Sequence, residues 1–383
     1  MRIAILTTDN REHQRTYQET QPRFGPAIEA VRQGLAELPD VEIHVISCTQ
    51  QPMHAPAKLS ENTWFHLLDV PKIGWLRTGY QGCVRAIRRK VRELKPDIVH
   101  GQGTERECAL SAVFSGFPNV VTIHGNMTTV AQAMKARVGS FLWCAALLER
   151  FTLPRTLGVF CNSAYTESVV GKYARQTWRV PNAVRREFFQ TPLPPASATA
   201  KPILLNIGAI SPYKRQLALL EVAEELYREG HSFELQFIGV ADPRDKYGAI
   251  FLQRIEATER IGFARYLGTK SLAELIAALD AASALVHVPS EEAFGLVVAE
   301  ALARNLKFFG TKVGGVTDIA SGIEGAELFP LDDSSALKFA IAQWLRSGCP
   351  RPESAVREMQ RRYDPEVIAM RHAEIYRAII ASR

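Results

Sequence analysis

Two kinds of segment alternate along this chain. Short apolar segments rich in β-branched residues, such as residues 203–208, have the composition of buried strands. Longer segments, such as residues 216–228, repeat apolar residues every three or four positions and have the pattern of amphipathic helices. Parallel strands require crossover connections, which are usually helical. The alternation therefore predicts doubly wound α/β sheets covered by helices.

The alternation occurs in two series, separated by a Pro-, Ser- and Ala-rich stretch at residues 191–202 that we expect to be a linker. A length of 383 residues suits two domains. We expect an N-terminal Rossmann-like domain at residues 1–185 and a C-terminal one at 186–363, followed by an amphipathic helix at 364–383. The predicted strands are 2–7, 41–47, 64–68, 98–100, 119–124, 203–208, 233–239, 264–267 and 284–288. The predicted helices are 26–38, 80–94, 107–114, 216–228, 252–259, 271–278 and 297–303, with a polar loop between residue 7 and Pro26.

The composition is that of a soluble globular protein, with 46% hydrophobic and 22% charged residues. No apolar run approaches the roughly 20 residues that span a bilayer. The first apolar segment has the length of a strand, not of a signal peptide. The 6 cysteines are scattered without a C-x-x-C pair, which is typical of reduced thiols. We therefore expect a cytoplasmic protein.

The net charge of +6 is unevenly distributed, because residues 1–185 are basic and the remainder is slightly acidic. Two interpretations stay open for the basic helix at residues 80–94. Its arginines either contact an anionic membrane surface peripherally or form an ordinary solvated helix face. The arginines concerned are Arg85, Arg88, Arg89 and Arg92. No block of aromatic residues interleaves the basic ones, so we expect no nucleic-acid partner.

The most informative stretch for function is residues 288–318, where a strand, a polar turn and a helix follow one another. Such a unit directs backbone N–H groups and the positive end of a helix at one place, which suits an anion such as phosphate. Glu292 lies in the turn and Glu300 in the helix, with seven residues between them. Two surface glutamates on an ordinary strand–helix unit are the alternative.

Other residues at predicted strand ends have the chemistry of a binding site. Gly208 follows a strand and precedes Lys214, a combination of close backbone approach and positive charge that suits a diphosphate. His124 ends a strand, where a histidine is either structural or a hydrogen-bonding group for a ligand. Gly25 precedes the first long helix and is either a turn glycine or part of a phosphate-binding loop.

Residues 288–318 resemble the E-x7-E signature of the retaining glycosyltransferases of family 4. That family usually shows P-S-x-x-E-G-F-G-L-P and then G-G-x-x-E, and this chain departs from it at Ala293, Val297 and Asp318. The matching residues are Pro289, Ser290, Glu292, Phe294, Gly295, Leu296, Gly314 and Gly315. The resemblance implies the α/β GT-B fold, in which two Rossmann-like doubly wound domains face a central cleft. Residues 1–185 would be the acceptor-side domain and residues 186–363 the nucleotide-sugar-binding domain, and the helix at 364–383 would cross back to the N-terminal domain.

The resemblance also implies roles for particular residues. Glu292 and His124 would be catalytic and lie close to the donor sugar. The nucleotide sugar would be bound by Gly25, Gly208, Lys214, Arg215, Leu267, Phe294, Gly295, Leu296 and Glu300. Two departures bear on these roles: the family's diphosphate-binding Arg is replaced by Ala209, and its Asp after the histidine by Gly125. Arg215 is the candidate to compensate for Ala209.

The function implied is retaining, metal-independent transfer of a hexose from a UDP- or GDP-linked sugar to a glycan or lipid-linked acceptor. The resemblance places this reaction in the synthesis of cell-surface polysaccharide, lipopolysaccharide or glycolipid. The nucleotide sugar would be a co-substrate, and we expect no cofactor. Two alternatives stay open: another sugar-nucleotide enzyme of the same fold, such as an epimerase, and a catalytically degenerate binding or regulatory partner of a glycosyltransferase.

Overall fold

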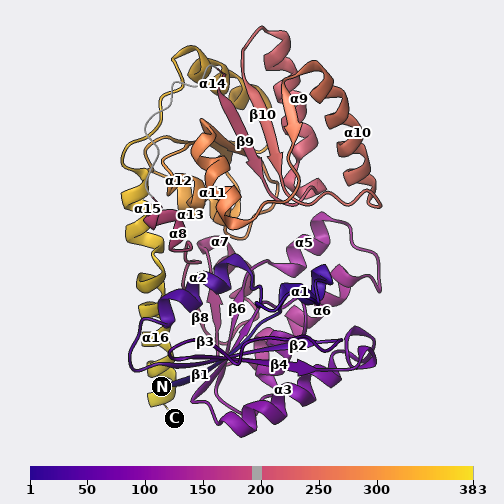
Figure 1. The fold of residues 1–383 in the computed structure, drawn as a ribbon, viewed down its shortest axis with the longest axis vertical. Coiled ribbons are helices and arrows are strands. Elements are labelled where there is room, and N and C mark those ends of the chain that lie inside the picture. Colours follow the sequence, from indigo (N-terminus) through magenta and orange to yellow (C-terminus); the bar gives the residue numbers. More distant parts are fainter. Residues whose placement is uncertain (192–200, 383) are drawn as a thin grey trace. The chain divides into compact units, whose positions relative to one another are not determined.

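The computed structural model describes residues 1–191 and 201–382, which form two compact units. Unit 1 comprises residues 1–186 and 363–383, and unit 2 comprises residues 187–362. Each unit is an α/β layer structure built on its own sheet (Figure 1). Most of the stretch expected to be a linker, residues 192–200, lies outside the described residues.

Unit 1 contains an 8-stranded sheet with the order β3-β4-β2-β1-β5-β6-β7-β8. All its pairings are parallel except that of β3 with β4, so nearly every strand needs a crossover and ends at the same edge. The strands are β1 (Arg2–Leu6), β2 (Glu42–Thr49), β3 (Lys58–Ser60), β4 (Thr63–Asp69), β5 (Ile98–Gln102), β6 (Asn119–Ile123), β7 (Val159–Cys161) and β8 (Thr177–Arg179).

Helices cover both faces of this sheet, and each face has its own hydrophobic core. The α-helices of unit 1 are α1 (Asn10–Gln14), α2 (Pro26–Leu35), α3 (Gln81–Leu94), α4 (Glu107–Val113), α5 (Met127–Ala133), α6 (Phe141–Thr152), α7 (Ala164–Val170) and α16 (Pro365–Ala381). Three 3₁₀ turns are η1 (Lys72–Gly74), η2 (Leu76–Thr78) and η3 (Leu153–Arg155).

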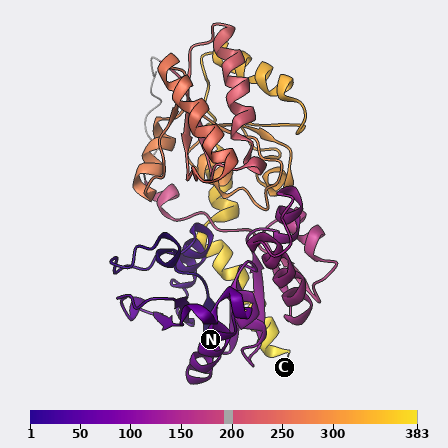
Figure 2. The same cartoon turned by 90° about the vertical axis from the view of Figure 1, so that its right-hand side faces the viewer.

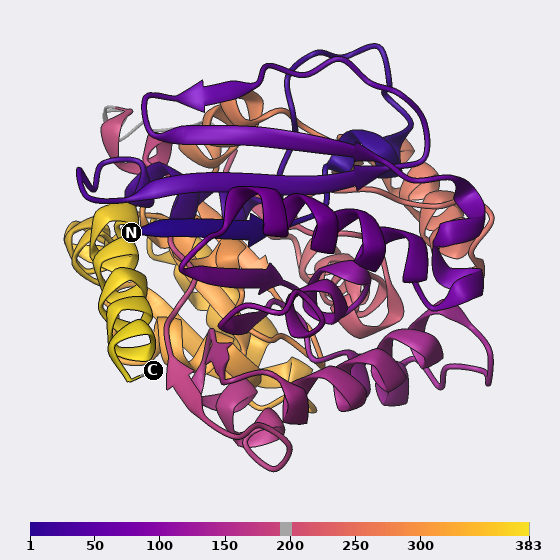
Figure 3. The ribbon, with the colours of Figure 1, turned by 90° about the horizontal axis from the view of Figure 1, so that it is seen from below.

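The C-terminal helix α16 belongs to unit 1 and packs against α2. Its residues Ile368, Ala369, Tyr376 and Ile379 are buried in the same core as the strand residues Ile3 and Ile5. At Gly34 an added Cβ would lie only 1.9 Å from the carbonyl oxygen of Pro365, which shows how closely the two helices approach. Figure 3 shows α16 beside the start of β1. The end of the chain is therefore an integral part of unit 1.

Unit 2 contains a 6-stranded parallel sheet with the order β11-β10-β9-β12-β13-β14. Its strands are β9 (Ile203–Ile207), β10 (Glu234–Ile238), β11 (Ala264–Tyr266), β12 (Ala284–His287), β13 (Lys307–Thr311) and β14 (Ala326–Phe329). Its helices are α8 (Glu187–Gln190), η4 (Pro212–Lys214), α9 (Gln216–Arg228), α10 (Lys246–Ile261), α11 (Leu272–Ala281), α12 (Leu296–Leu302), α13 (Gly314–Ala320), α14 (Ser334–Arg346) and α15 (Ala355–Tyr363).

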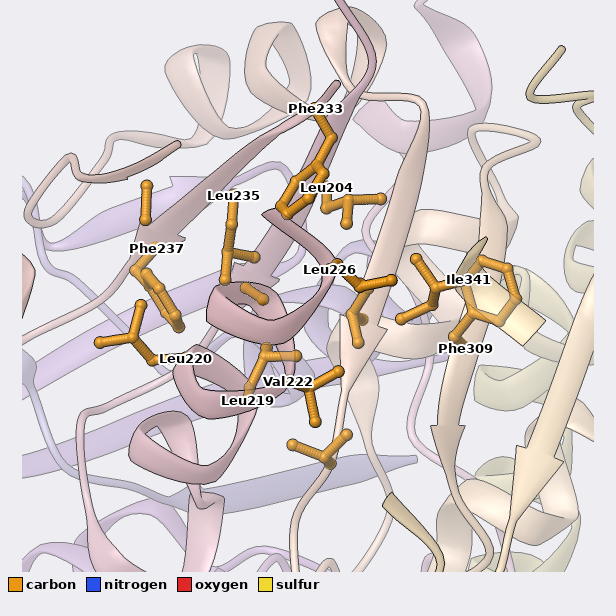
Figure 4. Packing of buried hydrophobic residues seen from close by; sticks show 14 of the residues in the cluster. Leu204, Leu219, Leu220, Val222, Leu226, Phe233, Leu235, Phe237, Phe309 and Ile341 are labelled. Carbon is orange, nitrogen blue, oxygen red and sulfur yellow. The ribbon is translucent and has the colours of Figure 1, made fainter. Parts of the chain in front are cut away.

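Helices flank the sheet of unit 2 (Figure 2). One core of unit 2 packs α9, α10 and α14 against this sheet. Leu219, Val222 and Leu226 of α9 lie over the strands, among side chains such as Phe237 and Phe309 (Figure 4). These α9 positions recur every three or four residues, so one side of the helix is buried. The core holds the carboxyl ends of the strands, and the loops that follow them, in fixed positions.

Two expected elements differ from the structure. The loop after β1 contains the short helix α1, which begins because the side chain of Asp9 accepts a hydrogen bond from the backbone N–H of Arg11. Helix α10 spans Lys246–Ile261 and not only residues 252–259. Its N-cap is Asp245, whose side chain accepts hydrogen bonds from the N–H groups of Tyr247 and Gly248. In both cases a side-chain cap starts a helix where the apolar periodicity is weak.

Candidate active site

Two neighbouring loops of unit 2 form the centre of the candidate site. One follows β9 and contains η4, and the other follows β12 and leads into α12. Because β9 and β12 are adjacent and parallel, both loops emerge at the same edge of the sheet. They are joined directly, since the backbone N–H of Ser290 donates to the carbonyl oxygen of Tyr213 at 2.7 Å and its hydroxyl donates to the same oxygen at 3.2 Å.

Three charged or titratable side chains meet between these loops. Lys214 from the β9 loop forms an ion pair with Oε2 of Glu292 from the β12 loop. His287, the last residue of β12, bonds to the same oxygen at 3.0 Å. All three side chains are largely buried, at 15%, 14% and 2% exposure respectively. The structure thus brings together two residues that the sequence predicts for the site and a third that it does not.

The protonation states of this cluster follow from its geometry. Burial alone raises the pKa of Glu292, but the charge of Lys214 and the hydrogen bond from His287 outweigh it and lower the pKa to about 2. Burial lowers the pKa of Lys214, but Glu292 more than compensates, so the pKa of Lys214 is raised. Burial also lowers the pKa of His287. At neutral pH the cluster holds an ammonium, a carboxylate and a neutral imidazole that donates its Nε2–H to Glu292.

The turn after Glu292 is held in shape by close backbone contacts. Gly295 has φ 94°, in the left-handed region, and serves as the N-cap of α12. Phe294 is buried, and an added Cβ at Gly315 would lie 2.5 Å from both the Phe294 Cα and the Ala293 oxygen. The N–H of Gly315 donates to the Glu292 carbonyl at 3.0 Å. The start of α12 at Leu296 is therefore fixed next to Glu292.

Glu300, the second carboxylate of the predicted pair, lies within α12 and is 4% exposed. A carboxylate that is buried this deeply keeps its charge only when it has hydrogen-bonding partners. Its position in the helix, two turns beyond the loop of Glu292, is the one expected from the sequence.

The glycine turn after β9 lies against the neighbouring loop after β10. At Gly239 an added Cβ would lie 1.9 Å from the carbonyl oxygen of Gly208, so this approach requires glycine at Gly239. Nothing lies within 4 Å of a Cβ added at Gly208, although its φ of 153° disfavours a side chain. Gln216 spans the turn: its amide donates to the Ala209 oxygen at 3.0 Å and accepts from the Ser211 N–H at 3.2 Å.

Arg215 has a structural contact away from the cluster. Its Nη1 donates to the carbonyl oxygen of Leu331 at 2.9 Å, beyond β14. Arg215 is also the N-cap of α9 and has φ 58°. The structure therefore places this guanidinium on the β14 side and not at the position of Ala209.

Leu267 follows β11 and extends its pairing with β10. Its backbone N–H donates to the Phe237 oxygen at 2.8 Å. The next residue, Gly268, accepts from the N–H of Gly239 at 2.9 Å. A ligand contact at Leu267 would therefore have to use its carbonyl oxygen or side chain.

His124 lies in unit 1, directly after β6, and bonds through Nε2 to Oε1 of Gln102 at 2.9 Å. Burial lowers the pKa of His124 to about 4, although the hydrogen bond with Asn182 opposes this shift. The imidazole is therefore neutral at physiological pH and can act as a hydrogen-bonding group. Gln102 ends the adjacent strand β5, which explains the contact.

The loop after His124 is anchored by a buried carboxylate of α6. Glu149 accepts hydrogen bonds from the N–H groups of Met127 and Thr128, at 2.8 and 3.0 Å. It also accepts from the hydroxyl of Thr104, at 3.0 Å, in the loop after β5. These bonds satisfy N–H groups at the start of α5 and fix the backbone next to His124.

Gly25 is the N-cap of α2 in unit 1, with φ −62° and ψ 148°. A Cβ added there would meet only the Ile28 Cδ1, at 3.5 Å, so the backbone does not require glycine. The preceding loop is held by a fully buried ion pair between Arg11 and Asp9. Asp9 also accepts from the N–H of Arg23 at 3.2 Å.

The predicted site residues thus divide between the units. Gly25 and His124 lie in unit 1. The other nine lie in unit 2, where Lys214 and Glu292 are in direct contact. Sequence reasoning missed His287 and Gln102. Both residues lie at strand ends, His287 two residues before Pro289 and Gln102 two residues before Thr104. This position is the sequence feature that could have indicated them.

The described residues contain no group of three or more His, Cys, Asp or Glu side chains arranged to hold a metal ion. The cysteines are free thiols, and four of the six are buried. None of the helices in residues 1–191 and 201–382 combines the length and apolarity needed to cross a membrane.

Two family models match the chain and together span most of it. The model of Glycosyltransferase Family 4 matches residues 28–188, and that of Glycosyl transferases group 1 matches residues 191–363. A search of curated protein sequences found no significant match.

Solved structures of similar fold include sucrose-phosphate synthase from Thermosynechococcus elongatus, with a TM-score of 0.79, 20% identity and full coverage of both chains. Anabaena HepE in complex with UDP-glucose has a TM-score of 0.70 at 14% identity, covering 99% of this chain and all of that one. The lipopolysaccharide outer core galactosyltransferase WaaB has a TM-score of 0.64 at 16% identity, with 99% and 100% coverage.

Two α/β units, each built on its own largely parallel sheet, give this chain the GT-B fold, as the similar solved structures show. This chain belongs to glycosyltransferase family 4, as the models on its two halves show. The expectations for family and fold are confirmed.

Proposed function

We propose that this chain transfers a hexose from a nucleotide-diphosphate sugar to a glycan or lipid-linked acceptor, with retention at the anomeric carbon and without a metal ion. The observation that carries the proposal is the buried cluster of Lys214, Glu292 and His287 at the edge of the unit 2 sheet. A lysine that remains charged beside a helix start is suited to a diphosphate. A carboxylate that remains ionised beside it is suited to sugar hydroxyls.

In the proposed reaction, the bond between the anomeric carbon and the diphosphate oxygen breaks, and the acceptor hydroxyl oxygen bonds to that carbon on the same face. The proton of that hydroxyl passes to the leaving diphosphate. Negative charge then builds up on the leaving diphosphate. Lys214 and the N–H groups at Phe294–Leu296 would stabilise this charge. Glu292 would orient the sugar and stabilise positive charge on it, as carboxylates do in glycoside chemistry. Glu300 would accept hydrogen bonds from the ribose.

The remaining predicted residues would complete the donor site. Gly208 would allow the backbone to approach the diphosphate, and Leu267 would contact the base. His124 would offer a neutral imidazole to a sugar hydroxyl. Gly25 would meet the diphosphate from unit 1. UDP-linked sugars are the first donors to test, because HepE, which shares the fold, was solved with UDP-glucose.

The acceptor and setting are proposed on the same basis. Synthesis of a cell-surface polysaccharide, lipopolysaccharide or glycolipid is the proposed role, in the cytoplasm, and the lipopolysaccharide galactosyltransferase WaaB has a related fold. A second candidate is a catalytically degenerate partner protein, which the replacement of the usual diphosphate-binding arginine by Ala209 favours. Arg215 does not stand in for it in the structure, since it bonds to Leu331.

The test is a transfer assay in which the protein is incubated with UDP- and GDP-sugars and a panel of glycan and glycolipid acceptors. The anomeric configuration of the product is read by NMR. The proposal expects a product with the donor's configuration, and loss of transfer in Glu300→Ala. An inverted product would contradict retention. The alternative of a catalytically degenerate partner would be favoured by a different result. In that case the well-folded protein would bind donors but neither transfer their sugar to an acceptor nor hydrolyse them.

A further inference from the structure

The outward side of α3 in unit 1 carries four arginines on one stripe. They are spaced at i, i+3, i+4 and i+7 and all are exposed: Arg85, Arg88, Arg89 and Arg92. The opposite side of the helix, with Val84, Ile87 and Val91, is buried in the core. Figure 3 shows α3 lying across the sheet of unit 1, viewed from below.

The charges of this stripe are not balanced within the described chain. The nearby carboxylate of Glu93 pairs with Lys90, and no hydrogen bond or ion pair joins any of the four guanidinium groups to another described residue. Like charges at spacings of three and four residues destabilise a helix. A helix that carries four arginines together therefore becomes more stable when an anionic partner binds.

A groove of about 600 Å³ lies beside the stripe. Arg85 and Arg89 line one part of it, together with Thr78 and Gln81, and Asp69 is the acidic residue of its lining. The chain before α3 packs very closely on the helix beside this groove. An added Cβ at Gly82 would lie 2.5 Å from the Cα of Gly74. The groove therefore offers two arginines and the amide of Gln81 to a phosphate-sized anion, while the hydroxyl of Thr78 already donates to the backbone oxygens of Ile73 and Trp75.

The loop beside the groove exposes apolar side chains among basic ones. Ile73 is 73% exposed and Leu76 is 39% exposed. Lys72 and Arg77, in the same two 3₁₀ turns, are also exposed. Single exposed apolar residues are ordinary, but two within one short loop, next to a basic stripe, match the composition of surfaces that bind at a membrane interface.

We propose that α3 and the loop before it form a docking surface for an anionic lipid bilayer. The docking surface comprises Lys72, Ile73, Leu76, Arg77, Arg85, Arg88, Arg89 and Arg92. Lipid phosphates occupy the groove against Arg85 and Arg89, while Ile73 and Leu76 enter the boundary between headgroups and acyl chains. The apolar residues favour a bilayer over a soluble anion, and the lack of exposed aromatic side chains at this surface disfavours a nucleic acid.

The test is sedimentation of the full chain with vesicles of phosphatidylcholine containing 30% phosphatidylglycerol, and with vesicles of pure phosphatidylcholine, at low and at physiological salt. No nucleotide is added, so the result is independent of the glycosyltransferase reaction. We expect binding to the anionic vesicles that weakens as salt increases. The double variant Arg85→Gln, Arg89→Gln is expected to reduce the partition coefficient for anionic vesicles at least tenfold. The single variant Ile73→Ser is expected to reduce it severalfold.

The matched control is Arg346→Gln with Arg371→Gln, which removes the same charge from exposed positions on α14 and α16. It is expected to leave vesicle binding within twofold of the unchanged chain. Three results would overturn the proposal: no sedimentation with anionic vesicles at low salt, equal binding to neutral vesicles, or equal losses in the two double variants. Stabilisation of the chain by inorganic phosphate without vesicle binding would also overturn it, because the groove would then bind a soluble anion.

Discussion

His287 donates a hydrogen bond to Glu292 across 3.0 Å, onto the same carboxylate oxygen that pairs with Lys214. The carboxylate of Glu292 therefore has two partners: His287 at the end of β12 and Lys214 in the loop after β9. If a donor diphosphate draws Lys214 away, His287 still fixes the carboxylate. We infer that His287 is a positioning residue for Glu292, acting through it on the sugar.

Replacing His287 tests this role. His287→Ala should lower kcat about 10- to 100-fold with little change in KM for the donor, because a hydrogen bond to a charged group contributes roughly 1.5–3 kcal/mol. Since that bond also lowers the pKa of Glu292, the acid limb of the pH–rate profile should move to higher pH. His287→Gln, which keeps a donor, should recover part of the rate. His231→Asn, on a loop before β10, is the control, and equal effects of His231→Asn and His287→Ala would contradict the assignment.

Lys214 supplies the positive charge in the proposed diphosphate site. Lys214→Ala should weaken nucleotide diphosphate binding by about 30-fold or more, since truncating one partner of a buried charged contact costs at least ~2 kcal/mol. Lys214→Arg should retain part of the affinity. Lys201→Ala removes a lysine at the opposite end of β9, where it bonds to the Gly262 oxygen, and should leave affinity unchanged. Calorimetric titration gives these affinities, and undiminished binding in Lys214→Ala would remove this residue from the site.

The turn that carries Glu292 depends on glycine at position 315. A Cβ there would overlap the Ala293 oxygen and the Phe294 Cα, both at 2.5 Å. Gly315→Ala should therefore lower the free energy of unfolding by about 1–3 kcal/mol, because backbone must move. Gly25→Ala should change it by less than about 0.5 kcal/mol, since its Cβ meets only Ile28. Denaturant titration compares the two variants, and equal stabilities would show that the turn adapts without cost.

The stability of unit 1 should decrease as pH falls from about 6.5 to 4. Burial lowers the pKa of His372 to about 4, so within this window the unfolded chain binds a proton that the folded chain does not. The free energy of unfolding therefore falls with pH, by roughly 3 kcal/mol at most for this residue. Chemical denaturation at pH 7, 6 and 5 should show the decrease, and His372→Gln should reduce its slope. An unchanged slope in the variant would mean that His372 is not kept neutral by burial.

Much of the fold could be predicted from local patterns. The nine predicted strands correspond to β1, β2, β4, β5, β6, β9, β10, β11 and β12, which are short segments dominated by apolar and β-branched residues. Strands β3, β7, β8, β13 and β14 were not predicted. Helix α1 could not be found in this way, since its five residues are all polar. It is held instead by the Arg11–Asp9 ion pair and by bonds from Arg11 to the Glu19 and His54 oxygens. Those contacts join segments that no local pattern connects.

The site was predictable to a similar extent. The E-x7-E spacing placed Glu292 in a turn and Glu300 in a helix, as the structure has them. The contact of Lys214 with Glu292 joins the loops after β9 and β12, two strands that become neighbours only in the sheet order. In the sequence, His287 is one polar residue in an apolar strand. Its role becomes evident only once the contact between Lys214 and Glu292 is known. Likewise Gln102 meets His124 because β5 and β6 are adjacent.

The proposed function requires unit 2 to bind a nucleotide diphosphate at the Lys214–Glu292 cluster. The most direct measurement is a calorimetric titration of the full chain with UDP, GDP and ADP, repeated in Lys214→Ala and Glu300→Ala. We predict saturable binding of one of these nucleotides by the unchanged chain, and much weaker binding in both variants. Absence of binding to all three by well-folded protein, or binding that both variants retain, would contradict it.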